Sequence, residues 1–229
     1  MLIELQHITK YYENAGTGAK RMVLDDISLS INPGDAIAIV GPSGSGKSTL
    51  LNIIGTLDSP SSGSVCFDGK EINSLKEAEL ANIRNQHIGF VFQMHHLLPQ
   101  LTLIENVLIP AIPQIDKAKR KTAGTRAMDL LQLVGLADKV NQYPGQMSVG
   151  ECQRAAVVRA LINEPELILA DEPTGSLDND SAMQLGDLLM DIKKNFSVAI
   201  IVVTHSSELA QRMSITYRLL NGKLVLFSK

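Results

Sequence analysis

The nine residues "GPSGSGKST", from Gly41 to Thr49, constrain this chain more than any other stretch. They follow the apolar run "AIAIV", typical of a strand buried on both faces, and precede the helical pattern "KSTLLNIIGTL". A strand, a glycine-rich turn and a helix in this order let backbone N–H groups and the helix N-terminus form a cradle for an anion. The plain alternative is a glycine-rich turn that binds nothing, and the complete motif argues against it.

Each residue type in this loop has a physical role. The glycines permit a tight turn that points N–H groups inward, Lys47 can reach terminal phosphates, and the hydroxyl of Ser48 is placed to bind Mg²⁺. We therefore expect the whole stretch to bind phosphate: Gly41, Pro42, Ser43, Gly44, Ser45, Gly46, Lys47, Ser48 and Thr49.

Three further strand-like segments end in polar groups that suit the same chemistry. "LILADE" ends in Asp171 and Glu172, "IGFVFQ" ends in Gln93, and His205 follows "VAIIVVT". In a parallel sheet the carboxyl ends of the strands line the ligand crevice. Beside a phosphate loop, one carboxylate can hold Mg²⁺ through water and a second can polarise an attacking water. Each group alone is ordinary at a strand end, but together they predict one phosphate site.

The order of the patterns indicates an α/β fold. Sheet-like segments in residues 1–93 and 164–229 flank a stretch, 94–163, in which helical patterns dominate. We expect one domain over 1–229 with 94–163 as its helical part. Near the end, Asn221-Gly222 between two apolar runs predicts a hairpin with a type I′ turn.

Composition narrows the possible partners. The chain has 229 residues, a net charge of −3 and no block of Lys and Arg, which argues against a dedicated nucleic-acid binder. Its longest apolar runs are strand-sized, so we expect membrane contact only through partners. The two cysteines, Cys66 and Cys152, are far apart and are expected to be ordinary thiols of a cytosolic protein.

Taken in order, these motifs resemble the nucleotide-binding subunits of ABC transporters over nearly the whole chain. By this resemblance "GPSGSGKST" is the Walker A motif, "LILADE" is Walker B, Gln93 is the Q-loop and His205 the switch histidine. "MSVGE" at 147–151 is similar to the signature, and 176–178 to the D-loop. The fold implied is a P-loop NTPase with a RecA-like core, an antiparallel β subdomain and a helical subdomain.

The resemblance also implies a mechanism. Two copies would pair head to tail around two ATP, closure of the pair would drive integral membrane permease subunits, and ATP hydrolysis would reset them. Glu172 would be the general base or the residue that orients the water, and His205 would hold the γ-phosphate and the attacking water in line. Lys47 would bind the terminal phosphates, and Gln93 would sense Mg²⁺ and signal to the membrane partner. The implied magnesium ligands are Ser48, Gln93 and Asp171. Tyr12 would stack on adenine, with Tyr11 as the alternative.

The signature departs from its consensus, L-S-G-G-Q. The resemblance gives Ser148, Gly150, Glu151 and the D-loop Asp178 contacts with the second copy's nucleotide. Val149 replaces a glycine, and if that position needs a positive φ, strain of about 1–3 kcal/mol would favour a weakly hydrolysing regulatory cassette. The plain interpretation of Ser148-x-x-Glu151 is a helix capping box, and it is compatible with a working signature.

The segment "NQHIGFVFQMHHLLPQLTLIENVLIP" resembles one branch of the family, whose members serve lipoprotein release, macrolide export and cell division. "HHLLP" is most similar to the lipoprotein-releasing members, which implies a peripheral protein on the cytoplasmic face of the bacterial inner membrane. Leu97 and Leu98 belong either to a groove for the permease or to the core. A soluble ABC ATPase acting on DNA or ribosomes, or a P-loop kinase, fits the motifs less well.

Overall fold

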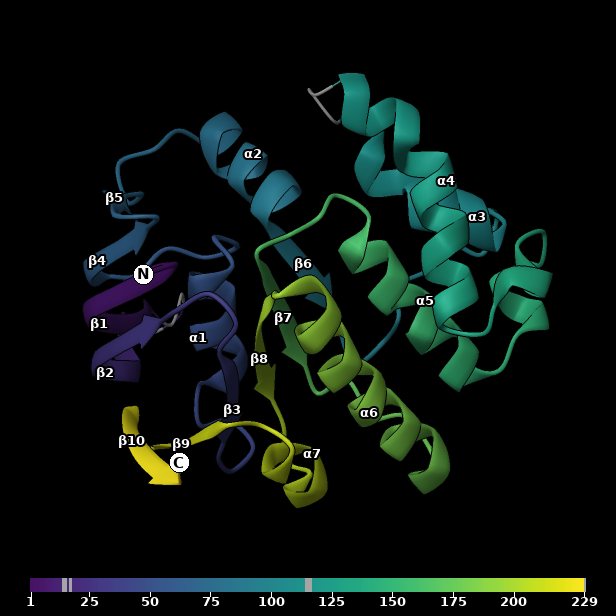
Figure 1. Ribbon diagram of the computed structural model, residues 1–229. Coiled ribbons are helices and arrows are strands. Elements are labelled where there is room, and N and C mark those ends of the chain that lie inside the picture. Colours follow the sequence, from purple (N-terminus) through teal and green to yellow (C-terminus); the bar gives the residue numbers. More distant parts are fainter. Residues whose placement is uncertain (14–15, 17, 114–116, 229) are drawn as a thin grey trace.

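The computed structural model describes residues 1–13, 16, 18–113 and 117–228, without the side chains of residues 119 and 120. Its first layer is a four-stranded antiparallel sheet at the left of Figure 1. In spatial order the strands are β2 (Lys20–Ile31), β1 (Ile3–Glu13), β4 (Ser62–Phe67) and β5 (Lys70–Glu71). This sheet stands beside the strand-and-helix layers that carry the phosphate loop.

The second layer is a six-stranded sheet in the order β10-β9-β3-β8-β7-β6. Neighbouring strands from β9 to β6 run parallel, and β10 pairs with β9 antiparallel. The carboxyl ends of β3, β8, β7 and β6 therefore meet at one edge. The bounds are β3 Ala36–Val40, β6 Ile88–Val91, β7 Leu167–Asp171, β8 Ala199–Val203, β9 Ile215–Leu220 and β10 Lys223–Ser228.

Helices cover the sheets and form the group at the right of Figure 1, where α3, α4 and α5 lie. Their bounds are α1 Lys47–Ile54, α2 Glu77–His87, α3 Leu103–Leu108, α4 Lys117–Leu133, α5 Val149–Leu161, α6 Asn179–Phe196 and α7 Ser207–Gln211. Three short 3₁₀ turns occupy Ile109–Ala111, Ala137–Lys139 and Pro144–Gln146. No helix in the described part of the chain is both long and apolar enough to span a membrane.

The alternation of side chains along β3 explains why the six-stranded sheet is buried on both faces. Ile37 and Ile39 point into a core shared with α1 and the four-stranded sheet, whereas Ala36 and Ala38 point into a core shared with α5 and α6. Because both faces are covered by apolar layers, this strand is a continuous apolar run.

The hairpin predicted near the end of the chain is confirmed. Asn221 and Gly222 have φ values of 50° and 78° between β9 and β10, as a type I′ turn requires.

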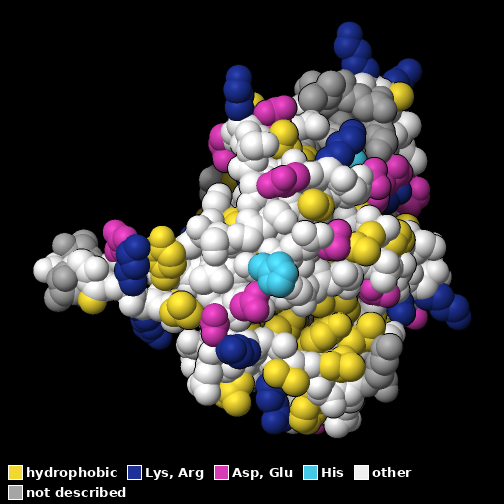
Figure 2. Space-filling model, turned by 90° about the vertical axis from the view of Figure 1, so that its left-hand side faces the viewer, with side chains coloured by type: hydrophobic (Ala, Val, Ile, Leu, Met, Phe, Trp, Pro, Cys, Tyr) yellow, Lys and Arg dark blue, Asp and Glu magenta, His cyan; other side chains and the backbone are white. Residues whose placement is uncertain are grey.

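Figure 2 views the face on the side of the four-stranded sheet, where Lys, Arg, Asp and Glu side chains are scattered. Hydrophobic side chains gather at its lower end, at the level of β10, which exposes Val225, Leu226 and Phe227.

Asn106 of α3 organises the segment that follows β6. Its side chain is fully buried, accepts from the Leu98 N–H at 2.7 Å and donates toward the carbonyls of Leu98, Leu101 and Thr102 at 3.0 Å each. A buried amide that satisfies four backbone groups holds a loop that lacks secondary structure of its own.

We predict that Asn106→Ala lowers the free energy of unfolding by about 2–3 kcal/mol, because these backbone groups lose their buried partner. Urea unfolding followed by circular dichroism measures this change. Asn82→Ala, at an exposed position of α2, is the matched control and should change stability by less than about 0.5 kcal/mol. Equal effects of the two substitutions would contradict the role given to Asn106.

Candidate functional site

One cavity of about 700 Å³ lies at the edge where the parallel strands end. It gathers residues from the phosphate loop, from the ends of β6, β7 and β8, and from β1 and β2. Its lining comprises Tyr12, Arg21, Val23, Ser43, Gly44, Gly46, Lys47, Ser48, Thr49, Gln93, Glu172, Gly175 and His205. Gly41 and Pro42 line an adjoining hollow with His205, and Ser45 lines another.

Two glycines are required by the geometry of the phosphate loop. Gly46 has φ 103° at the N-cap of α1, and a Cβ there would lie 2.9 Å from Val23. A Cβ on Gly41 would lie only 2.3 Å from the Leu219 carbonyl oxygen of β9. The loop therefore fits against β2 and β9 only with glycine at these places, which leaves its N–H groups and the N-terminus of α1 facing the cavity.

Lys47, His205 and Glu172 form a connected group of charged and polar side chains. The Lys47 ammonium donates to the carbonyls of Gly41 and Pro42 at 3.0 and 3.1 Å and lies 3.1 Å from His205 Nε2. Glu172 Oε2 accepts from the His205 backbone N–H at 3.0 Å, and Oε1 lies 3.2 Å from His205 Nε2. Because these two carbonyls are uncharged, they do not neutralise the Lys47 ammonium, which can still attract an anion in the cavity.

The backbone of Glu172 is strained. Its φ is 46°, in the left-handed region that a glutamate rarely adopts, at a cost of about 1–3 kcal/mol. Its N–H donates to Val203 O and its carbonyl accepts from the Gly175 N–H, so the turn after β7 holds this conformation. Asp171 is the last residue of β7, whereas Glu172 lines the cavity.

Buried polar atoms without partners mark the same region. Five atoms of the described side chains are buried without a hydrogen-bond partner, and three of them lie here: Asp171 Oδ1, Ser45 Oγ and Glu172 Oε1, which has the 3.2 Å ion-pair contact with His205. The other two are Gln142 Oε1 and Gln153 Oε1. Because leaving a buried polar atom unpaired is costly, the three atoms in this region fit a site that receives a polar ligand and its cation.

Tyr12, and not Tyr11, lines the cavity. The strand pleat sends the two side chains to opposite faces of β1, and the Tyr11 ring instead lies 4.4 Å from the Lys20 ammonium. Arg21, directly across from Tyr12 on β2, also lines the cavity. Sequence reasoning missed Arg21 and Val23, because only the strand register brings them to the loop.

The signature lies outside this cavity, at the start of α5. Ser148 is the N-cap: its backbone N–H donates to Glu151 Oε2 at 2.8 Å, and its Oγ accepts from the Glu151 N–H at 3.2 Å. The predicted capping box is therefore confirmed. Val149 is the first helical residue, is half-exposed and is not among the described non-glycine residues with positive φ, so the strain considered for it does not arise.

Glu151 is also neutralised by Lys139. Its Oε1 lies 2.8 Å from the Lys139 ammonium, and this contact together with the Ser148 N–H lowers the pKa of Glu151. Asp178 caps α6 by accepting from the Ser181 N–H at 2.9 Å, which lowers the pKa of Asp178. Gly150 packs beside Ser181, where a Cβ would lie 3.0 Å from the hydroxyl. The signature and the D-loop thus adjoin each other.

Fold and site together define a P-loop nucleotide-binding protein. A family model described as ABC transporter matches residues 24–175. The lipoprotein-releasing system ATP-binding protein LolD of Bacteroides fragilis is 45% identical over 224 residues, covering 98% of this chain and 100% of the relative. LolD of Geobacter metallireducens is 47% identical and covers 98% of both chains.

Solved structures agree. An ATP-binding cassette, solved as a dimer in a post-hydrolysis state bound to ADP and Pi, superposes with a TM-score of 0.86 at 35% identity and covers 99% of this chain and 98% of that one. A second dimeric structure of the same cassette, described as a bacterial ABC transporter cassette, gives the same TM-score at 38% identity, covering 97% of this chain and 96% of that one. The chain belongs to the ABC transporter family: it is an ATP-binding ATPase, and the predicted fold class is confirmed.

Proposed function

We propose that this chain hydrolyses ATP with Mg²⁺ to power the release of lipoproteins from the bacterial inner membrane through integral permease subunits. The observation that carries this proposal is full-length similarity, at 44–47% identity, to relatives named as lipoprotein-releasing ATPases. The chain would act on the cytoplasmic face of that membrane, as a peripheral protein without direct contact with its cargo.

Mg²⁺ fits the oxygen-rich group at the strand ends. Ser48 and Gln93 line the cavity and would hold the ion through the hydroxyl and the amide oxygen, with Asp171 acting through water. The unpartnered, buried Asp171 Oδ1 supports this assignment, because Mg²⁺ prefers oxygen ligands and retains waters. When bound, the ion would neutralise charge that develops on the phosphates.

The side chains at the end of β7 and β8 suit hydrolysis. Glu172, held by the backbone N–H of His205, would accept a proton from the attacking water. Lys47 would exchange its two carbonyl partners for phosphate oxygens, and His205 would orient the γ-phosphate. These groups are supplied by three different elements, so their alignment depends on the parallel sheet.

Two copies would complete each site. Ser148 and Gly150 of one copy would contact the γ-phosphate bound by the other, with the N–H groups and dipole of α5 favouring the anion. Val149 occupies an ordinary helical position. The local backbone therefore does not favour the alternative function, a regulatory cassette with a degraded signature. A relative with the same fold, solved twice as a dimer, supports the pairing.

A groove of about 790 Å³ is the proposed seat for a permease helix. Apolar side chains dominate its lining, including Phe90, Phe92, Ile109 and Pro110. Arg159 of α5 lines it and donates to the carbonyls of His95 and His96 at 2.7 Å, and Gln153 donates to Phe92 O at 2.7 Å.

These contacts tie the groove to the signature helix. We infer that residues 94–163 move as the unit that relays closure to the membrane partner. Of the two leucines after Gln93, Leu97 is buried in the core with α5, whereas Leu98 is exposed.

Glu172→Gln should lower ATP turnover roughly 100-fold or more, because the amide cannot accept the proton from water. With ATP and Mg²⁺ the variant should accumulate as a dimer, measured by light scattering, and should copurify with lipoprotein-release-type permease subunits from host membranes. Glu71→Gln, exposed on β5, is the control and should behave as the unaltered chain. Recovery of an exporter or a cell-division membrane protein instead would refute lipoprotein release.

Lys139→Ala should weaken ATP-driven dimerisation about 5-fold, because it leaves the Glu151 carboxylate uncompensated where the second copy's γ-phosphate would approach. The double variant Lys139→Ala with Glu151→Gln removes that charge and should restore dimerisation. Lys70→Ala on β5 is the matched control. If the double variant is as weak as the single one, the charge-compensation account is wrong.

A further inference from the structure

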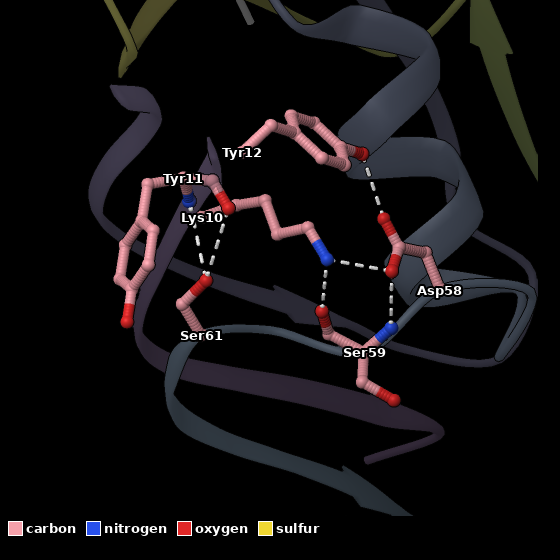
Figure 3. A network of polar contacts seen from close by, with 6 residues as sticks. All are labelled: Lys10, Tyr11, Tyr12, Asp58, Ser59 and Ser61. Atoms are coloured by element: carbon pink, nitrogen blue, oxygen red, sulfur yellow. Dashed lines mark hydrogen bonds and ion pairs between the residues drawn. The ribbon is translucent and has the colours of Figure 1, made fainter. Parts of the chain in front are cut away.

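A polar network links the cavity-lining Tyr12 to the helix that starts at the phosphate loop (Figure 3). The Tyr12 hydroxyl donates to Asp58 Oδ2 at 2.7 Å, and Asp58 Oδ1 accepts from the Lys10 ammonium at 2.6 Å. Lys10 also donates to the Ser59 carbonyl at 2.7 Å, while the Ser59 N–H donates to Asp58 Oδ1 at 2.7 Å. None of these three side chains carries out a step of hydrolysis.

The Lys10–Asp58 pair is buried enough to hold the network in one arrangement. Lys10 is only 9% exposed, so its charge must be paired, and Asp58 supplies the carboxylate. Partial burial acts to raise the pKa of Asp58, but the hydrogen bonds from Lys10 and Tyr12 outweigh it and lower that pKa. Burial and the bond to Asp58 raise the pKa of Tyr12, which keeps its hydroxyl a donor. The pairing is therefore stable around neutral pH.

Asp58 connects this group to the phosphate loop. Its backbone N–H donates to the Asn52 carbonyl of α1 at 3.2 Å, and the neighbouring Leu57 N–H donates to the same oxygen at 2.8 Å. Because α1 begins at Lys47 in the loop, the position of Asp58 is fixed relative to the phosphate cradle. The Tyr12 hydroxyl is thereby tied to the same helix that orients the phosphates.

The ring of Tyr12 remains available. It is 45% exposed and lines the cavity with Ser48 and Thr49, and the Lys10 ammonium lies 4.9 Å from its centroid. Figure 3 shows the Tyr12 and Tyr11 rings pointing to different sides of β1, with only Tyr12 directed at Asp58. A flat aromatic ring held at its hydroxyl end presents a preorganised surface on which a planar base can stack.

We propose that Lys10 and Asp58 are positioning residues that fix the Tyr12 ring for base stacking. This inference rests on the proposed nucleotide site, because it assigns the base to Tyr12. Without the network the ring must be ordered during binding, and ordering one free side chain weakens affinity about 3- to 10-fold. The binding affinity should fall for ligands that carry a base and should stay the same for ligands that consist of phosphate alone.

The test compares ADP with pyrophosphate by isothermal titration calorimetry on the full chain. Tyr12→Phe keeps the ring and the Lys10–Asp58 pair and removes only the anchoring hydroxyl. It should raise the Kd for ADP about 3- to 10-fold and leave the Kd for pyrophosphate within about 2-fold. Tyr11→Phe is the matched control and should change neither Kd.

Lys10→Met and Lys10→Arg test the buried cation. Lys10→Met removes the charge and should weaken ADP binding as Tyr12→Phe does, whereas Lys10→Arg keeps a cation for Asp58 and should recover most of the affinity. A purely structural role would change ADP and pyrophosphate affinity together, and that result overturns the inference. If Lys10→Met does not fold, Tyr12→Phe alone decides.

Tyr12→Ala separates this inference from the proposed site. If Tyr12→Ala weakens ADP binding but Tyr12→Phe does not, the ring stacks without needing the network, and the positioning role is wrong while the site stands. If neither variant changes ADP affinity, the base does not bind at Tyr12, and the assignment of that site fails with the inference.

Discussion

The convergence of parallel strand ends is the constraint on which the rest of this structure depends. β3, β8, β7 and β6 are neighbours in one sheet and point their carboxyl ends to one edge. Backbone hydrogen bonds fix the spacing of these strands, so the sheet brings the loop after β3, the carboxylates at the end of β7 and the histidine after β8 to one place, where Lys47, His205 and Glu172 also contact one another. Burial of β3 on both faces makes that edge rigid.

A strained backbone and a buried carboxylate oxygen without a partner lie next to each other at this edge. Glu172 is held at φ 46°, and Asp171 Oδ1 is buried without a partner among the described residues. Two apolar cores stabilise the sheet on either side and can offset the free-energy cost of the strained backbone and of the unpartnered oxygen. The pattern is that of a site arranged for a ligand before the ligand arrives, as electrostatic preorganisation requires.

Much of this arrangement could be predicted from the sequence, because it depends on local patterns. The phosphate loop, the buried strand before it, the capping box at Ser148 and the turn at Asn221-Gly222 each follow from neighbouring residues. The contact between Lys10 and Asp58 could not be predicted, because 48 residues separate them and only the pairing of β1 with the region after α1 joins them. The bounds of the short helix α3 could not be predicted, because its six residues are too few for a full amphipathic repeat.

The concern over Val149 shows where a consensus misleads. A glycine in a motif suggests a backbone that only glycine adopts, yet this position is the first turn of a helix, where valine is permitted. The catalytic and nucleotide-binding roles of the individual residues stay predictions, since they depend on a second copy and on ligands. What the fold establishes is that the phosphate loop, Gln93, Glu172 and His205 line one cavity at this edge, with the signature outside it.

The central claim is that each hydrolysis site is completed by a second copy of the chain. The most direct measurement is the ATP turnover rate per chain over a wide range of protein concentrations, at saturating ATP and Mg²⁺. We expect the rate per chain to rise with concentration and to level off once the dimer is fully formed. A rate per chain that stays constant down to concentrations at which light scattering detects only monomer would contradict the claim.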